Sequence, residues 1–233
     1  MTEPRIVNRE DWLVARKAHL EKEKAFTRLR DDLARQRREL PWVRIDKRYV
    51  FEGPEGKLSF ADLFSGKSQL LTYHFMLGPE WEEGCPSCSF WADNYNGTDI
   101  HLAQRDTALI AVSRAPVARI EAYKKRMGWT FRWVSSAGSD FNFDFGVSFD
   151  PAKRVEGEHN YNFGTTTFGG EEAPGLSAFR RGEDGAIYHT YSTYARGLDM
   201  FNAAYHLLDL TSKGRDEAEL PWPMAWVKRH DRY

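Results

Sequence analysis

Gly84-Cys85-Pro86-Ser87-Cys88 is a CxxC motif that holds the only two cysteines of the chain. An apolar run at residues 70–76 precedes it, and an apolar-periodic segment at residues 90–95 follows it. This order predicts a buried strand, a loop and a helix, with Cys85 at the N-cap and Pro86 at the first helical position, where the fixed φ of proline suits a helix start. Unpaired backbone N–H groups and the helix dipole stabilise an anion there, so we expect a lowered thiol pKa at Cys85.

Cys88 lies one helical turn beyond Cys85, within disulfide reach and under more cover. This asymmetry favours a redox pair with Cys85 as the nucleophile and Cys88 as the resolving thiol. Two inert buried thiols, or half of a metal site, are the alternatives. Structural zinc usually takes four protein ligands, and a second cysteine pair is missing, so a metal would need scattered histidines such as His74 or His101. We therefore expect no metal and no bound cofactor.

Composition narrows the function classes. The chain has 233 residues, 41% hydrophobic and 29% charged, as in a soluble globular protein, and its net charge of −1 gives no electrostatic case for nucleic acid or an acidic membrane. No apolar run is long enough to cross a bilayer, and the N-terminus lacks a signal-peptide core. We therefore expect a cytoplasmic protein. Structural disulfides are rare in that compartment, so the two thiols either cycle or never react.

Three parts are expected along the chain: a helical extension (1–41), a main domain (42–213) and an apolar, aromatic tail (214–233) that docks. The extension reads as one charged helix over residues 8–40, with Asn8 as N-cap and Pro41 as its stop. Its interrupted apolar stripe is expected to pack on the main domain or on another subunit, which makes a homodimer one expectation. The stripe consists of Trp12, Leu13, Leu20, Phe26, Leu29 and Leu33.

Within the main domain, buried-strand patterns flank helical ones. A strand at 107–112, a helix at 115–127 and a strand at 129–134 follow the CxxC helix, and this β-α-β-α-β order implies a parallel sheet. Residues 137–172 show no sustained period, but their aromatic content predicts a packed loop insertion. A hairpin over 176–191 and a helix at 198–210 complete the domain.

This order of elements resembles the thioredoxin superfamily. Residues 56–67 are similar to the opening segment of peroxiredoxins and periplasmic thiol reductases, and Pro174 is spaced like the cis-proline that begins a late strand of thioredoxins. Residues 85–93, 112–116, 126–129 and 189–197 resemble one bacterial domain-of-unknown-function family, described as predicted dithiol-disulfide oxidoreductases. The resemblance implies an α/β thioredoxin-like fold, with a central mixed sheet, helices on both faces, an added N-terminal helix and an aromatic loop insertion.

The motif and the resemblance together predict a thiol-disulfide oxidoreductase. Cys85 would attack the disulfide of a protein or small-molecule substrate, Cys88 would resolve the mixed disulfide, and a cellular reductant would restore the dithiol. One alternative is a thiol peroxidase acting through Cys85, although Glu82 stands where the peroxiredoxin signature has Thr or Ser. A non-catalytic binding or dimerisation module is another.

Several neighbours are candidate supporting residues besides Pro86 and Ser87. Trp81 lies four residues before Cys85, whereas thioredoxin has its tryptophan immediately before the first cysteine. The charge of Glu83 would oppose a thiolate, or its carboxyl would shuttle a proton, or it is an ordinary solvated acid of the loop. Tyr73 and His74 either neighbour Cys85 or are packed strand residues. Pro174 is either a cis-proline beside the cysteines, offering a strand edge to a substrate, or an ordinary trans-proline.

Overall fold

The computed structural model describes residues 4–153 and 158–233. The chain divides into two compact units, Met1–Pro41 and Trp42–Tyr233. Among the described residues, no helix combines the length and the apolar character that crossing a bilayer requires.

The first unit is built on helix α1 (Arg9–Arg38), which confirms the predicted long helix. Asn8 caps it: the Asp11 backbone N–H donates to Asn8 Oδ1 at 2.8 Å, and Asn8 Nδ2 donates to Asp11 Oδ2 at 3.0 Å. None of the α1 residues is buried, and the apolar stripe is exposed. The partner of this stripe stays a prediction.

The second unit contains, among its described residues, an eight-stranded sheet in the order β1-β10-β9-β4-β5-β6-β2-β3 and a separate two-stranded sheet of β7 and β8. The large sheet consists of β1 (Val43–Arg44), β2 (Val50–Gly53), β3 (Gly56–Ser59), β4 (Gln69–His74), β5 (Thr107–Ser113), β6 (Arg132–Ser135), β9 (Gly175–Arg181) and β10 (Ile187–Tyr194). The small one consists of β7 (His159–Tyr161) and β8 (Thr166–Phe168).

Strand β4 lies in the middle of the large sheet. It pairs in parallel with β5, which pairs in parallel with β6, and it pairs antiparallel with β9 of the β9–β10 hairpin. Helices α2 (Pro86–Ala92) and α3 (Thr98–Ala103) join β4 to β5, and α4 (Val117–Arg126) joins β5 to β6. Three parallel strands joined through helices, followed by an antiparallel hairpin beside the first of them, form a thioredoxin-like fold, as the sequence predicts.

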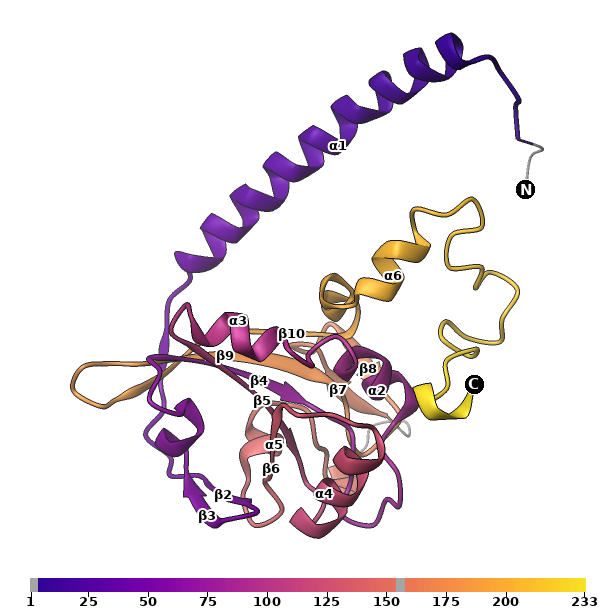
Figure 1. The fold of residues 1–233 in the computed structure, drawn as a ribbon. Helices are drawn as coiled ribbons and strands as arrows, with labels where there is room; N and C mark the ends of the chain where they lie inside the picture. The colour runs from indigo at the N-terminus through magenta and orange to yellow at the C-terminus, as the bar shows by residue number, and fades with distance from the viewer. Residues whose placement is uncertain (1–3, 154–157) are drawn as a thin grey trace. The chain divides into compact units, whose positions relative to one another are not determined.

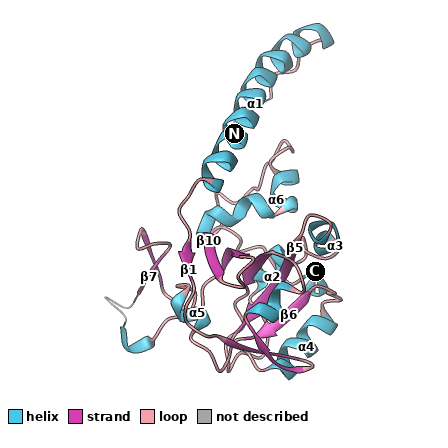
Figure 2. Ribbon diagram, turned by 90° about the vertical axis from the view of Figure 1, so that its left-hand side faces the viewer, coloured by secondary structure: helices cyan, strands magenta, loops and turns pink. Residues whose placement is uncertain are grey.

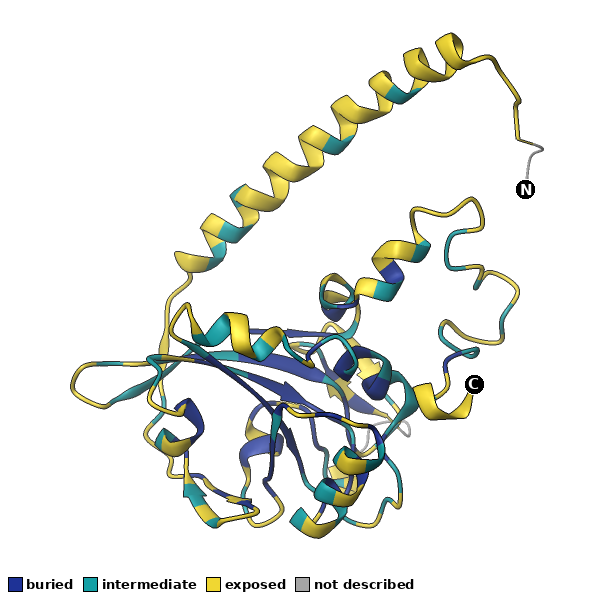
Figure 3. Ribbon diagram, viewed as in Figure 1, coloured by how far each residue is buried: buried dark blue, intermediate teal, exposed yellow. Residues whose placement is uncertain are grey.

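Helices cover both faces of this sheet (Figure 2), and a buried apolar cluster fills each side. Tyr73, Trp133 and residues of α2 and α4 form one cluster. The other contains Leu70, Val112 and two short helices, η1 (Ala61–Phe64) and α5 (Phe141–Asp144). Figure 3 shows the buried residues concentrated in the central strands and in α2. The CxxC helix is therefore packed against the buried middle of the sheet.

Residues 137–172 are more regular than a loop. They contain α5, the 3₁₀ turn η2 (Pro151–Lys153) and the β7–β8 hairpin, while residues 154–157 lie outside the described residues. Phe141, Phe145 and Tyr161 are buried, which confirms the predicted packing of aromatic residues. These elements are too short to leave a sustained period in the sequence, which is why none was found there.

The C-terminal region begins with the 3₁₀ helix η3 (Ala195–Phe201), followed by α6 (Ala203–Leu208). One continuous helix was expected over 198–210, but Asn202 separates the two by accepting a hydrogen bond from the Tyr205 N–H at 3.1 Å. Beyond α6, Glu217 Oε1 accepts from Tyr205 Oη, the Met224 N–H and Trp226 Nε1. The ring of Trp226 lies 5.5 Å from that of Phe90, and the last turn is η4 (His230–Arg232).

Candidate functional site

Cys85 is the N-cap of α2, and Pro86 occupies its first turn, as predicted. The Cys85 N–H donates to the Met76 carbonyl at 3.1 Å, which fixes the loop against the end of β4. Gly84 is required by packing, because a Cβ there would lie 2.6 Å from Phe75 Cε1 and 2.7 Å from Tyr123 Cε1. Cys85 is thereby held partly exposed, while Cys88 is buried, and both are free thiols.

The two thiols have opposite pKa shifts. The pKa of Cys85 is lowered to about 6, chiefly by the hydrogen bond from the Cys88 thiol. The Cys88 and Ser87 N–H groups and the Ser87 hydroxyl add to this effect, and together they outweigh the partial desolvation of Cys85. Burial raises the pKa of Cys88 well above its ordinary value. At neutral pH Cys85 is therefore the thiolate and Cys88 the proton-bearing thiol.

Glu83 does not act on Cys85 as a free charge. Arg126 hydrogen-bonds one of its oxygens, and Arg229 and Arg232 form ion pairs with it at 2.8 and 3.1 Å. The hydrogen bond from Arg126 and the charges of all three arginines hold the pKa of Glu83 below its usual range. The expected opposition to a thiolate is thus offset by arginines, two of which come from the C-terminal tail.

Arg229 also contacts the backbone beside Cys85. Its Nε and Nη2 donate to the Gly84 carbonyl at 3.0 and 2.7 Å, and its Nε lies 3.1 Å from Tyr123 Oη. We expect Arg229→Ala to lower the free energy of unfolding by about 1–3 kcal/mol, because charge-assisted hydrogen bonds to a partly buried carbonyl are lost. Arg232→Ala is the matched control, since Arg232 makes one surface contact to the same Glu83, and should stay within about 0.5 kcal/mol. Urea unfolding of both variants measures this, and equal effects would contradict the role of Arg229.

Tyr73 and His74 lie on opposite faces of β4. Tyr73 Oη donates to the Cys88 carbonyl at 3.3 Å, so Tyr73 is a neighbour of the dithiol. The His74 side chain packs near Phe141 and Phe145 on the other face, and its Nε2 lies 2.9 Å from Ser177 Oγ. Burial lowers the pKa of His74 to about 3. The structure therefore places His74 among the packed strand residues and away from Cys85.

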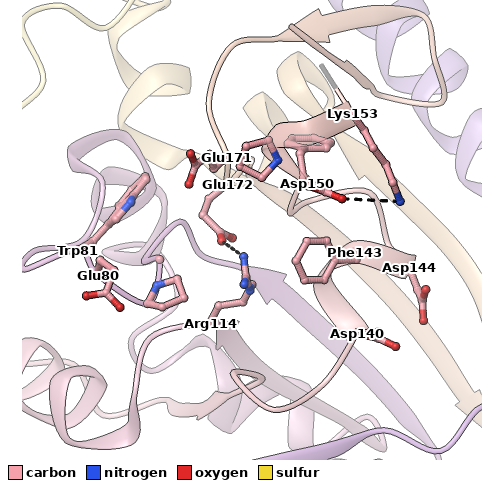
Figure 4. A pocket seen from close by; sticks show the side chains of 14 residues that line it. Glu80, Trp81, Arg114, Asp140, Phe143, Asp144, Asp150, Lys153, Glu171 and Glu172 are labelled. Carbon is pink, nitrogen blue, oxygen red and sulfur yellow. Dashed lines mark hydrogen bonds and ion pairs between the residues drawn. The ribbon is translucent and has the colours of Figure 1, made fainter. Parts of the chain in front are cut away.

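Trp81 lines a pocket that Figure 4 shows, and neither cysteine lines that pocket. This pocket lies between the loop before the CxxC motif and the aromatic insertion. Its buried Glu172 accepts from Arg114 Nη1 at 2.9 Å and from Ser148 Oγ at 2.6 Å. Trp81 is therefore outside the lining of the cavity beside the cysteines, although it packs against the apolar cluster that contains Cys88.

Pro174 lies beside the cysteines, immediately before β9. No peptide bond among the described residues is cis, so the expectation of a cis-proline is wrong. The backbone at Pro174 is held by Tyr161 instead. Tyr161 Oη donates to the Pro174 carbonyl and accepts from the Ala195 N–H at 3.0 Å. The aromatic insertion thus binds the backbone that was expected to be open to a substrate.

A cavity of about 750 Å³ opens beside Cys85 and Cys88. Four parts of the second unit line it: the region of the CxxC motif, the aromatic insertion, the segment after β10 and the tail. Helix α2 and strand β8, which belong to the first two, lie near each other in Figure 1. Its apolar lining comes from Met76 and Trp91 near the motif, Tyr161 and Phe168 of the insertion, Leu198 and Tyr205 after β10, and Pro223 and Met224 of the tail.

Most of the lining from residues 161–224 was not predicted from the sequence; the exceptions are Pro174, and Ala195 and Arg196 of the run 189–197, for which a polar cleft was one of two interpretations. The high aromatic content of the insertion and of the tail indicated that these segments are packed, but it did not indicate which residues they contact. Within the described residues, no three His, Cys, Asp or Glu side chains gather in a way that could hold a metal ion.

The protein is a thioredoxin-like protein: its CxxC dithiol lies at the start of the helix that follows the central strand of the sheet. Over residues 1–233 the sequence matches the family described as "Bacterial protein of unknown function (DUF899)", and the chain belongs to that family. No curated protein matches the sequence.

Solved structures similar to this chain include PrxQ of Xylella fastidiosa, with 13% identity, a TM-score of 0.43, and coverage of 68% of this chain and 88% of that one. The bacterioferritin comigratory protein of Xanthomonas campestris has 15% identity and a TM-score of 0.43, covering 66% and 88%. The peroxidoxin BcpB of Mycobacterium tuberculosis has 12% identity and a TM-score of 0.44, covering 71% and 95%.

Proposed function

We propose that this protein is a thiol-disulfide oxidoreductase that uses Cys85 as the nucleophile and Cys88 as the resolving thiol. The observation that supports it most is the asymmetry of the pair: a partly exposed thiol with a pKa lowered to about 6, hydrogen-bonded by a buried thiol with a raised pKa. A thiolate is the attacking species in disulfide exchange, and a shielded second thiol gives the mixed disulfide an internal route to release.

The reaction is a two-step exchange. The Cys85 thiolate attacks one sulfur of the substrate disulfide, forming a mixed disulfide and expelling the other half as a thiolate. Cys88 then loses its proton and attacks the Cys85 sulfur, releasing the second half as a thiol. The protein ends with a Cys85–Cys88 disulfide, the substrate has gained two electrons and two protons, and a dithiol reductant reverses the oxidation of the protein.

A single-turnover experiment tests the proposal. Reduced protein is mixed with bis(2-hydroxyethyl) disulfide, and its intact mass is followed over time. We expect the product to have lost two hydrogens, because Cys88 resolves the mixed disulfide. Protein that stays reduced, or that ends as a stable mixed disulfide, would refute the dithiol mechanism and favour a non-catalytic module.

The same mass measurement distinguishes peroxide reduction from disulfide reduction by the rate at which the two hydrogens are lost. Hydrogen peroxide would oxidise Cys85 to a sulfenic acid, which Cys88 would convert to the same intramolecular disulfide with release of water. We expect this reaction to be slower than disulfide reduction at equal oxidant concentration. A faster reaction with peroxide would move the assignment to a thiol peroxidase.

A further inference from the structure

The backbone beside the dithiol is already hydrogen-bonded within the chain. The Ala173 N–H donates to the Val147 carbonyl at 2.8 Å, and the Pro174 carbonyl accepts from Tyr161 Oη. Gly175 is in register with His74 on one side and Tyr194 on the other. A peptide that docks by adding a strand needs free N–H and C=O groups at an edge. The Ala173 N–H and the Pro174 carbonyl are therefore already bound within the chain, and Gly175 lies between two strands, so strand addition by a protein substrate is disfavoured here.

The space beside the dithiol has the dimensions of a small-molecule site. Its volume of about 750 Å³ lies in the range of roughly 300–1,000 Å³ typical of ligand pockets, which are predominantly apolar. Met76, Phe168 and Met224 reach it from three separate parts of the chain. An apolar substituent attached to the reacting sulfur would be removed from water by these side chains, and burial of apolar surface favours binding.

The charged groups that line the same cavity have partners. Arg215 Nη1 pairs with Asp199 at 2.9 Å, and Arg215 Nη2 pairs with Asp209 at 2.9 Å. Glu217 Oε1 accepts three hydrogen bonds, from Tyr205, Met224 and Trp226. Arg196, which also lines the cavity, pairs with Asp199 at 3.1 Å but is largely exposed. At Arg215 and Glu217 a strongly charged substrate would have to compete with the interactions above, whereas a neutral one would not.

We infer that the substrate of this site is a neutral, low-molecular-weight organic disulfide with apolar alkyl or aryl substituents, and not a disulfide of a protein. This rests on the proposed function and uses its chemistry unchanged. One substrate disulfide and the Cys85–Cys88 dithiol give two molecules of apolar thiol and the protein disulfide, and a dithiol reductant regenerates the protein. Residues of the aromatic insertion and the tail determine the specificity.

Three disulfides test the inference: dibenzyl disulfide, bis(2-hydroxyethyl) disulfide and insulin. Dithiothreitol supplies the electrons, and each rate with the full-length protein is divided by the rate with dithiothreitol alone, which removes differences in intrinsic reactivity. We expect the acceleration for dibenzyl disulfide to exceed that for bis(2-hydroxyethyl) disulfide by about tenfold or more, and insulin to be accelerated least.

Two kinds of result would contradict these expectations. Equal acceleration of the two small disulfides, or the greatest acceleration for insulin, would overturn the inference while leaving the oxidoreductase function in place. Acceleration of none of the three would refute the function itself, and the inference with it.

Substitutions in the lining of the cavity test whether these side chains cause the preference for dibenzyl disulfide. Phe168→Ser should lower the ratio of the accelerations for the two small disulfides, because an apolar contact with the substituent is lost. Met224→Gln is a second variant with the same expectation if Phe168→Ser does not fold. Leu207→Ser is the matched control and should leave the ratio unchanged, since Leu207 is 64% exposed and does not line this cavity. An unchanged ratio in the folded cavity variants would overturn the inference.

Discussion

Replacing Cys88 by serine is expected to stop turnover after the first attack and to leave half of a substrate disulfide bound to Cys85. The Cys85 thiolate still forms the mixed disulfide, but serine cannot displace the bound half as a thiol. We expect steady-state turnover to fall by at least about 10³-fold, because a residue of the covalent mechanism is removed. Intact-mass spectrometry of the Cys88→Ser protein after mixing with bis(2-hydroxyethyl) disulfide measures the trapped adduct.

Cys85→Ser is the matched control for this experiment. It should lose turnover to the same extent and form no adduct, because the remaining thiol of Cys88 is buried with a raised pKa. An adduct on Cys88 in that variant would mean that Cys88 is the nucleophile and Cys85 the resolving thiol. Retention of turnover in Cys88→Ser would show that the second thiol is not needed.

Phe141→Ala is expected to lower the free energy of unfolding by about 3–5 kcal/mol, the range for removing a buried phenylalanine. Phe141 has no exposed surface, and its ring lies within 5.5 Å of the rings of Tyr49, Phe51, Phe60 and Phe145. Alanine would leave a cavity among groups that come from the first strands and from the insertion. Urea unfolding followed by tryptophan fluorescence measures the change.

Phe163→Ala in the same insertion is the control. Phe163 is 73% exposed, so its removal should change the free energy of unfolding by less than about 0.5 kcal/mol. A small effect of Phe141→Ala, similar to that of Phe163→Ala, would show that the insertion does not belong to the folded core.

Local sequence signals were enough to predict much of this structure. The Asn8 cap, the CxxC pair at a helix start and the β-α-β-α-β order all depend on residues within a few positions of each other. The strand period also contained a signal that was not used: adjacent strand residues face opposite sides of a sheet, so Tyr73 and His74 could not both reach the cysteines.

Contacts between distant segments could not be predicted in the same way. Arg229 binds the Gly84 carbonyl across 145 positions, and nothing near either residue indicates the other. Tyr161 binds the Pro174 carbonyl because the β7–β8 hairpin lies beside the residue that precedes β9. These long-range contacts also form the cavity, which is why the motif could be found in the sequence and its surroundings could not.

The central claim is that Cys85 is a thiolate near neutral pH because Cys88 and the start of α2 stabilise it. The rate of Cys85 alkylation by iodoacetamide, measured against pH and followed by mass spectrometry, tests this most directly. We predict a rate that rises with pH through an apparent pKa of about 6 in the wild type, and through a higher pKa in Cys88→Ala, which lacks the hydrogen-bonding thiol. A wild-type value at or above the free-thiol pKa of about 8.5 would contradict the account.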